Sequence, residues 1–366
     1  MNLSLRFPLY AKFSLISMGI LACIVMLYIG QAIILPLLYS VILAILLNPM
    51  VNFIVSKGLN RNVSIFISVF FAIFIVLLLL YLISGQLSLF SDTYPLLKVK
   101  FYDSLLQLID WISDRFSIKK SAINKWINQN QIEAINNLGG TIGHTLSILN
   151  GILIIVVLIP VYIVLLLYYK VLILDFIHKL FVVEHHITLN GIFFNSKKII
   201  QGYLTGLLFE MIIIAILNSI ALLILGIDYA IVLGITGAII NIIPYIGGVI
   251  AIALPMIIAF ITKDTAIYPV MVFFVYLLIQ FIDNHFIIPH IVASKVKING
   301  LVCVIVVLLG AALWGIPGMF LSIPITAILK VVLDHTIAYR HWGALMGNIV
   351  PTTKTKLNFK KKKILT

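Results

Sequence analysis

Long runs of apolar residues, with few polar interruptions, dominate this chain. A helix needs about 20 residues to cross the hydrocarbon core of a bilayer, within a range of about 17–25. The pattern therefore predicts an all-α polytopic membrane protein. The apolar runs fall at 13–29, 32–49, 62–84, 146–169, 202–224, 229–243, 246–262, 266–290, 299–314 and 316–333.

Four of these runs are short, and they form two pairs at 229–262 and 299–333. Irregular backbone at membrane depth is tolerated only where it is buried in protein or lines a water-filled cavity. Paired short segments with such breaks are typical of transporters, so we expect two re-entrant helical hairpins beside about six full spans. If the short runs cross completely, the count rises to eight to ten spans. The residues expected at the hairpin tips are Pro244, Tyr245, Gly247, Gly248, Gly315, Pro317 and Gly318.

Two segments interrupt the apolar pattern. Residues 85–145 place apolar side chains at helical spacing among polar ones, which predicts a small helical insert outside the membrane. Residues 170–201 are also mixed, and we expect interfacial helices there. The resulting division is 1–84 with spans 1–3, 85–145 as the extracytoplasmic insert, 146–201 with span 4 and interfacial helices, 202–262 and 263–339 each with a span and a hairpin, and 340–366 as a basic tail.

Composition narrows the class of protein further. The chain is 62% hydrophobic and only 10% charged, whereas an ordinary globular domain is about 45–50% apolar and about 25% charged. A soluble enzyme, a disordered protein and a secreted disulfide scaffold are thereby excluded. Cys23 and Cys303 lie in separate apolar runs and form neither a disulfide framework nor a metal site. With no metalloprotease, P-loop or serine-hydrolase motif, we predict no enzyme activity, no cofactor and no metal.

The net charge of +13 indicates topology rather than a polyanion partner. Cytoplasmic loops of membrane proteins carry an excess of Lys and Arg. With the N-terminus inside, 18 of the 25 basic residues fall on the cytoplasmic side, including the run Lys360 to Lys363. We therefore expect both termini in the cytoplasm of a bacterial inner membrane, a tail attracted to anionic lipid, and no nucleic-acid binding.

A repeat with a spacing of 73 residues links the last two parts of the chain. Tyr203-Leu204 followed by Glu210 corresponds to Tyr276-Leu277 followed by Asp283, and Gly237-Ala238 followed by Pro244 corresponds to Gly310-Ala311 followed by Pro317. By the charge argument the first hairpin opens outward and the second opens inward. The sequence thus predicts an inverted repeat, an architecture that forms a substrate site near the membrane midplane.

Glu210 and Asp283 are the two acidic residues, out of twelve, that fall within predicted spans. Such residues are costly in a membrane and usually mark proton or ion pathways. We predict that they couple proton or ion movement to transport; the alternative is interhelical hydrogen bonding between close-packed spans. The polar residues expected along the same substrate pathway are Gln280, Asn284, Asn241, His285 and Asn218.

Four stretches resemble the autoinducer-2 exporter family, also described as PerM-type permeases. They are Ala44-Ile-Leu-Leu-Asn48-Pro49; the stretch from Leu225-Gly226 to Pro244-Tyr245-Ile-Gly247-Gly248; Gln280-Phe-Ile-Asp283-Asn284 leading to Pro289; and Gly310 to Pro324, followed by Lys330. The resemblance implies a multi-span inner-membrane permease with a helical outer insert. It also implies export of a small polar signalling molecule or, in some members, exchange of Na⁺ for H⁺. Leu207 and Gly300 depart from residues that are common in the family.

These observations together predict a secondary transporter that exports a small polar solute, such as a quorum-sensing signal, with proton coupling. A Na⁺(Li⁺)/H⁺ antiporter, a passive channel and a membrane scaffold with an envelope-facing partner domain remain alternatives. The expected partners are the lipid bilayer, the solute or ion and further copies of this chain in a homo-oligomer.

Overall fold

The structure is a computed structural model of the chain, and it describes residues 8–81, 99–100, 157–182, 185–263, 265 and 267–348. Most of the predicted insert and of the basic tail lie outside these residues. Apart from short turns and one isolated bridge between Ile298 and Gly347, the described part is helical, so the predicted all-α class is confirmed. The helices are α1 (Leu9–Ile29), α2 (Gln31–Ser56), Arg61–Tyr81, Val157–Tyr168, α5 (Lys170–Leu180), α6 (His186–Ile224), α7 (Ala230–Asn241), α8 (Gly247–Thr262), α9 (Ile267–Ile282), the π-helix η2 (Asp283–Ala293), α10 (Ser294–Val296), α11 (Gly300–His335), the 3₁₀ helix η3 (Ile337–Tyr339) and α12 (Arg340–Leu345).

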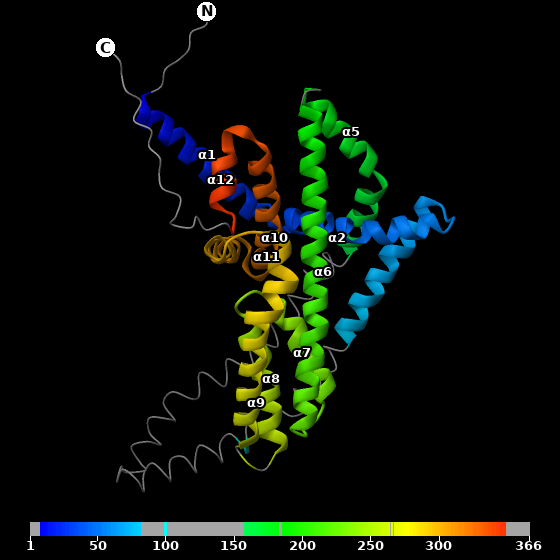
Figure 1. The fold of residues 1–366 in the computed structure, drawn as a ribbon, viewed down its shortest axis with the longest axis vertical. Helices are drawn as coiled ribbons and strands as arrows, with labels where there is room; N and C mark the ends of the chain where they lie inside the picture. The colour runs from blue at the N-terminus through cyan, green and yellow to red at the C-terminus, as the bar shows by residue number, and fades with distance from the viewer. Residues whose placement is uncertain are drawn as a thin grey trace, which may run out of the picture.

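By length and composition alone, six helices of the described part could cross a membrane: α1, α2, Arg61–Tyr81, α6, Ile267–Val296 and α11, of which α11 is broken at Gly315. The pair formed by Val157–Tyr168 and α5 adds a seventh if it crosses as one span, although it bends by 65°. In Figure 1, α6 is the longest helix, α7, α8 and α9 lie beside its C-terminal half, and α2 crosses it.

Helix α6 differs from the sequence-based expectation at its N-terminal end. The predicted interfacial segment up to residue 201 does not end there, since one helix of 39 residues continues from His186 to Ile224. Its sequence contains Gly202 and Gly206 but no proline. Because a proline, unlike a glycine, removes a backbone hydrogen bond and clashes with the preceding turn, nothing in this stretch forces the helix to break.

The first predicted hairpin is formed by α7 and α8. Helix α7 ends at Asn241, Pro244 follows in the break, and Tyr245 adopts a left-handed backbone with φ of 65°. A proline restricts the residue before it and cannot donate to a helix, which explains why the chain turns here. Helix α8 then begins at Gly247.

The second predicted hairpin lies within α11. The helix is interrupted at Gly315, which has φ of 63° and ψ of −144°. In a straight helix, residues 310 and 318 would be separated by about 12 Å along the axis. Instead, a Cβ placed on Gly310 would lie 2.4 Å from the carbonyl oxygen of Gly318. The two arms of α11 are therefore folded back against each other.

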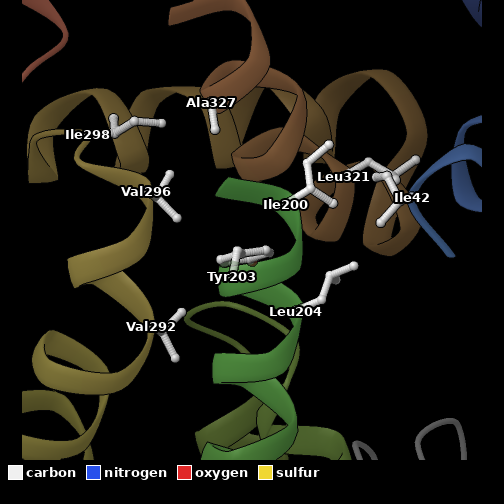
Figure 2. Close-up of a cluster of buried hydrophobic side chains, with 9 residues drawn as sticks. All are labelled: Ile42, Ile200, Tyr203, Leu204, Val292, Val296, Ile298, Leu321 and Ala327. Carbon is white, nitrogen blue, oxygen red and sulfur yellow. The ribbon is translucent and has the colours of Figure 1, made fainter. Parts of the chain in front are cut away.

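One apolar cluster joins α2, α6, η2, α10 and α11, as Figure 2 shows. Its centre is Ile200, Tyr203 and Leu204 of α6, which pack with Val292 of η2 and Leu321 of α11. Burial of such side chains contributes about 1.5–3 kcal/mol each relative to exposure. The cluster thus fixes η2 against α6, next to the site described below.

Candidate functional site

A cavity of about 490 Å³ lies between α6, the α7–α8 hairpin, α9 with η2, and α11. Most of its lining is apolar, and its polar side chains come from four separate elements. This is the usual composition of a small-molecule site, with an apolar wall and a few placed polar groups. The sequence-predicted residues that line it are Glu210, Asn241, Pro244, Tyr245, Gly248, Gln280, Asp283 and Asn284.

Asp283 has no exposed surface and is held from two sides. The side-chain amide of Asn241 donates to its Oδ2 at 3.0 Å, and that of Gln280 donates to the same oxygen at 3.5 Å. Its second oxygen, Oδ1, is buried and has no hydrogen-bond partner among the described residues. An unsatisfied buried acceptor costs about 1–3 kcal/mol, so this oxygen is an open position for a proton, a cation or a donor group of a solute.

Glu210 lies on the α6 wall of the same cavity. Its residue surface is 5% exposed, and among the described residues it forms no hydrogen bond or ion pair. Its carboxyl group and that of Asp283 both line this cavity. Two like charges repel strongly in a low-dielectric site, so a proton or a cation in the cavity relieves their repulsion. The two acids that correspond to each other in the predicted repeat therefore share one cavity.

The tip of the first hairpin closes against α9. Gly248 lies so near Gln280 that a Cβ would approach its Oε1 to 2.4 Å, and Gly247 is equally close to the Ile240 carbonyl oxygen, at 2.2 Å. At Gly247 the obstacle is backbone, so only glycine permits that contact, whereas at Gly248 it is the end of a flexible side chain. The close approach places Asn241, at the end of α7, within reach of Asp283.

The π-helix η2 begins at Asp283 itself. π-Helical turns are rare and occur frequently at functional sites. Inside η2, Pro289 has no N–H to donate, and two histidine rings form hydrogen bonds with backbone carbonyl groups. Nδ1 of His285 bonds Phe281 O at 2.9 Å, and Nδ1 of His290 bonds Phe286 O at 2.7 Å. These contacts are local, and the His285 ring also stacks on Phe281 at 4.2 Å.

Some predicted pathway residues lie elsewhere. His285 is exposed and does not line the cavity, and Asn218 is buried beside Gly237 with an unpartnered Oδ1. The second hairpin tip does not line the cavity either. It contacts α2 instead, where Tyr39 donates to the carbonyl of Pro317 at 3.1 Å. The structure therefore brings together the first tip and both acids, but not Gly315, Pro317 and Gly318.

The cavity also contains residues that sequence reasoning did not select. Tyr203 and Leu207 face it from α6, and Cys303 faces it from the first arm of α11. Tyr203 precedes Glu210 by seven residues, two helical turns, so the helical period placed both on one face. No sequence pattern indicates that Cys303 lines the cavity, because its position depends on how α11 packs. The described residues contain no cluster of three or more His, Cys, Asp or Glu side chains suited to a metal ion.

A bundle of membrane-length helices around a cavity with buried carboxyl groups defines a multi-pass membrane protein of the transporter class. The profile of the family described as "AI-2E family transporter" matches residues 16–338. The chain belongs to this family, which is a family of transporters and not of enzymes. The resemblance noted from the four sequence stretches is thereby confirmed.

Individual relatives match shorter stretches. "Putative transport protein YrrI" of Bacillus subtilis (strain 168) is 33% identical over 138 residues, which is 38% of each chain. "Putative transport protein YueF" of the same organism is 28% identical over 139 residues, or 38% of this chain and 37% of the relative. "Putative permease PerM" of Escherichia coli (strain K12) is 34% identical over 61 residues, 17% of each chain. The chain thus matches well under half of the length of these relatives.

Proposed function

We propose that this protein is a secondary transporter that exports a small polar solute, and that proton movement at Asp283 and Glu210 drives the export. The observation that carries the proposal is the shared cavity. Both carboxyl groups line it, and one oxygen of Asp283 has no partner. Intramembrane carboxyl groups that face a cavity are the usual elements of proton relays in transporters.

The surrounding amides give Asp283 its proposed role. Asn241 and Gln280 hold Oδ2, which leaves Oδ1 to take up a proton or a solute donor in turn. Asn241 stands at the end of a broken helix, so a movement of the hairpin would alter the hydrogen bonds of Asp283 directly. Solute binding and proton binding would in this way be linked through one carboxyl group.

The proposed topology follows from charge and repeat. We infer that both termini are cytoplasmic, that the membrane is the bacterial inner membrane, and that the two hairpins enter from opposite sides. Equivalent acids of the two repeat units facing one cavity support an inverted repeat, because such transporters bind their solute where the units meet. In the described part of the predicted outer insert, the Lys100 ammonium group donates to the carbonyls of Ile261 and Lys263 at the end of α8.

The test is transport into proteoliposomes under an imposed pH gradient, with autoinducer-2 and Na⁺ as the first solutes and a trapped pH dye as reporter. Asp283→Asn keeps the shape of the side chain but removes its titration. We expect the variant to lose the acceleration by the gradient. Asp228→Asn, which changes an exposed loop acid, is the matched control and should behave as wild type.

Each alternative has its own outcome. Equal acceleration of wild type and Asp283→Asn by the gradient would overturn the coupling role. Wild-type flux that neither saturates nor responds to pH indicates a channel. Proton movement driven by Na⁺ alone indicates an antiporter. Deletion of residues 86–144 should leave some flux in a transporter, whereas absence of flux from the intact chain for every solute would favour a scaffold.

A further inference from the structure

A second cavity, of about 320 Å³, lies between α2, the helix Val157–Tyr168, α5, α6 and α11. It shares no lining residue with the cavity around Asp283. Its wall is almost entirely apolar, with Val41, Ala44, Leu166, Phe193, Ile200 and Ile328 among the residues that form it. The proposed transport function uses none of these residues.

Positive charge gathers at the edge of this cavity without acidic compensation. Lys170 and Lys197 line it. The Arg61 guanidinium group is anchored beside the cavity, since it donates to the carbonyl of Leu167 at 3.2 Å. The cavity wall contains no Asp or Glu.

The acidic residue of α5, Asp175, is already paired. Asp175 forms an ion pair with Lys179 at 2.6 Å, with both side chains more than half exposed. Like charges repel, so an anion beside these three cations would be stabilised by all of them.

Asn48 indicates what kind of anion fits. It comes from the Asn48-Pro49 stretch noted in the sequence, and only 5% of its surface is exposed. Its Oδ1 accepts from the Lys170 Nζ at 3.1 Å, but its Nδ2 is buried and has no partner in the part of the chain that the structure describes. The Ser196 hydroxyl, on the same wall, is also buried and unpartnered. The unmet groups are an amide and a hydroxyl, which donate hydrogen bonds, so the missing ligand is rich in acceptors.

We propose that this cavity binds an anionic phospholipid, with the phosphate at Lys170, Lys197 and Arg61 and an acyl chain along the apolar wall. Phosphate oxygens would satisfy the Asn48 amide and the Ser196 hydroxyl. Basic pockets between membrane helices on the cytoplasmic side are suited to anionic headgroups. The apolar wall favours a lipid over a free phosphate ion, because a bare anion would leave that surface unfilled. The lipid would tie the bend before α5 to α2 and α6.

The test uses the purified full-length protein in detergent, titrated separately with phosphatidylglycerol, phosphatidylcholine, glycerophosphoglycerol and inorganic phosphate. The readouts are the midpoint of thermal unfolding and bound lipid counted by native mass spectrometry. We expect only phosphatidylglycerol to raise the midpoint and to remain bound. Lys197→Gln should weaken this binding about fivefold, since a basic residue near a lipid surface contributes roughly 1 kcal/mol.

Lys198→Gln is the matched control, because Lys198 is as exposed as its neighbour Lys197 but does not line the cavity. It should bind phosphatidylglycerol as wild type does. Ser196→Ala removes a hydroxyl that has no partner among the described residues, so the variant should fold normally but bind phosphatidylglycerol more weakly.

Three outcomes would overturn the proposal. Equal weakening by Lys198→Gln would indicate general surface attraction. Equal stabilisation by phosphatidylcholine would indicate non-specific lipid binding. Full stabilisation by inorganic phosphate or glycerophosphoglycerol would indicate an anion site that does not need the acyl chain.

Discussion

Two adjacent glycines at the first hairpin tip should respond very differently to the same substitution. A Cβ on Gly247 would lie 2.2 Å from the Ile240 carbonyl oxygen, whereas ordinary contacts begin at 3.4 Å. The backbone of α7 would have to move by about 1.2 Å, the difference between the two distances. Overpacking of this kind costs typically about 1–3 kcal/mol, and because a backbone group is the obstacle we expect Gly247→Ala to reach the upper end of that range.

Gly248→Ala meets a different obstacle. Its Cβ would lie 2.4 Å from Oε1 of Gln280, which is the end of a flexible side chain and can turn aside. The bond from Gln280 to Asp283 is already long, at 3.5 Å, and would be lost. One hydrogen bond contributes about 0.5–1.5 kcal/mol, so Gly248→Ala should fold nearly as wild type but transport with an altered response to pH.

The assay compares the temperature at which half of the solubilised protein remains monodisperse, followed by transport in proteoliposomes. Gly300→Ala is the control, since nothing lies within 4 Å of its Cβ position. If Gly247→Ala is as stable as Gly300→Ala, the hairpin tip is not packed as described. If Gly248→Ala transports with an unchanged pH response, Gln280 does not position Asp283.

Two further predictions concern α11. Gly315→Ala should lower stability by about 1–3 kcal/mol in the same monodispersity assay, because a backbone with φ of 63° and ψ of −144° is almost restricted to glycine. The added Cβ would meet no atom within 4 Å, so the cost would come from the backbone alone. If Gly315→Ala costs no more stability than Gly300→Ala, the described turn is wrong. Two single-cysteine variants compare the reactivity of the thiols: Cys23→Ala keeps Cys303, and Cys303→Ala keeps Cys23. A charged thiol reagent should modify Cys303 at least about tenfold faster than Cys23, because Cys303 lines the cavity and Cys23 lies exposed on the apolar surface of α1. Labelling by mass spectrometry checks this, and a Cys303 that stays unmodified from both sides of the membrane would contradict a water-accessible cavity.

The sequence by itself determined the membrane class and the breaks, because the bilayer imposes strong and local constraints. Apolar length predicts spans, and Pro244 and Gly315 sit where the helices turn. The cost of a charge in lipid also singled out Glu210 and Asp283. These predictions needed no knowledge of which helices are neighbours.

The packing of helices decided the rest. Asn241 and Gln280 reach Asp283, but Asn218 and His285, equally polar in the sequence, do not line its cavity. Helical period fixes the face on which a residue lies but not the helix that the face meets. Partners far apart in sequence, such as Lys170 and Asn48, were therefore undetermined until the chain was folded, because pairing between distant helices depends on the packing of the whole bundle.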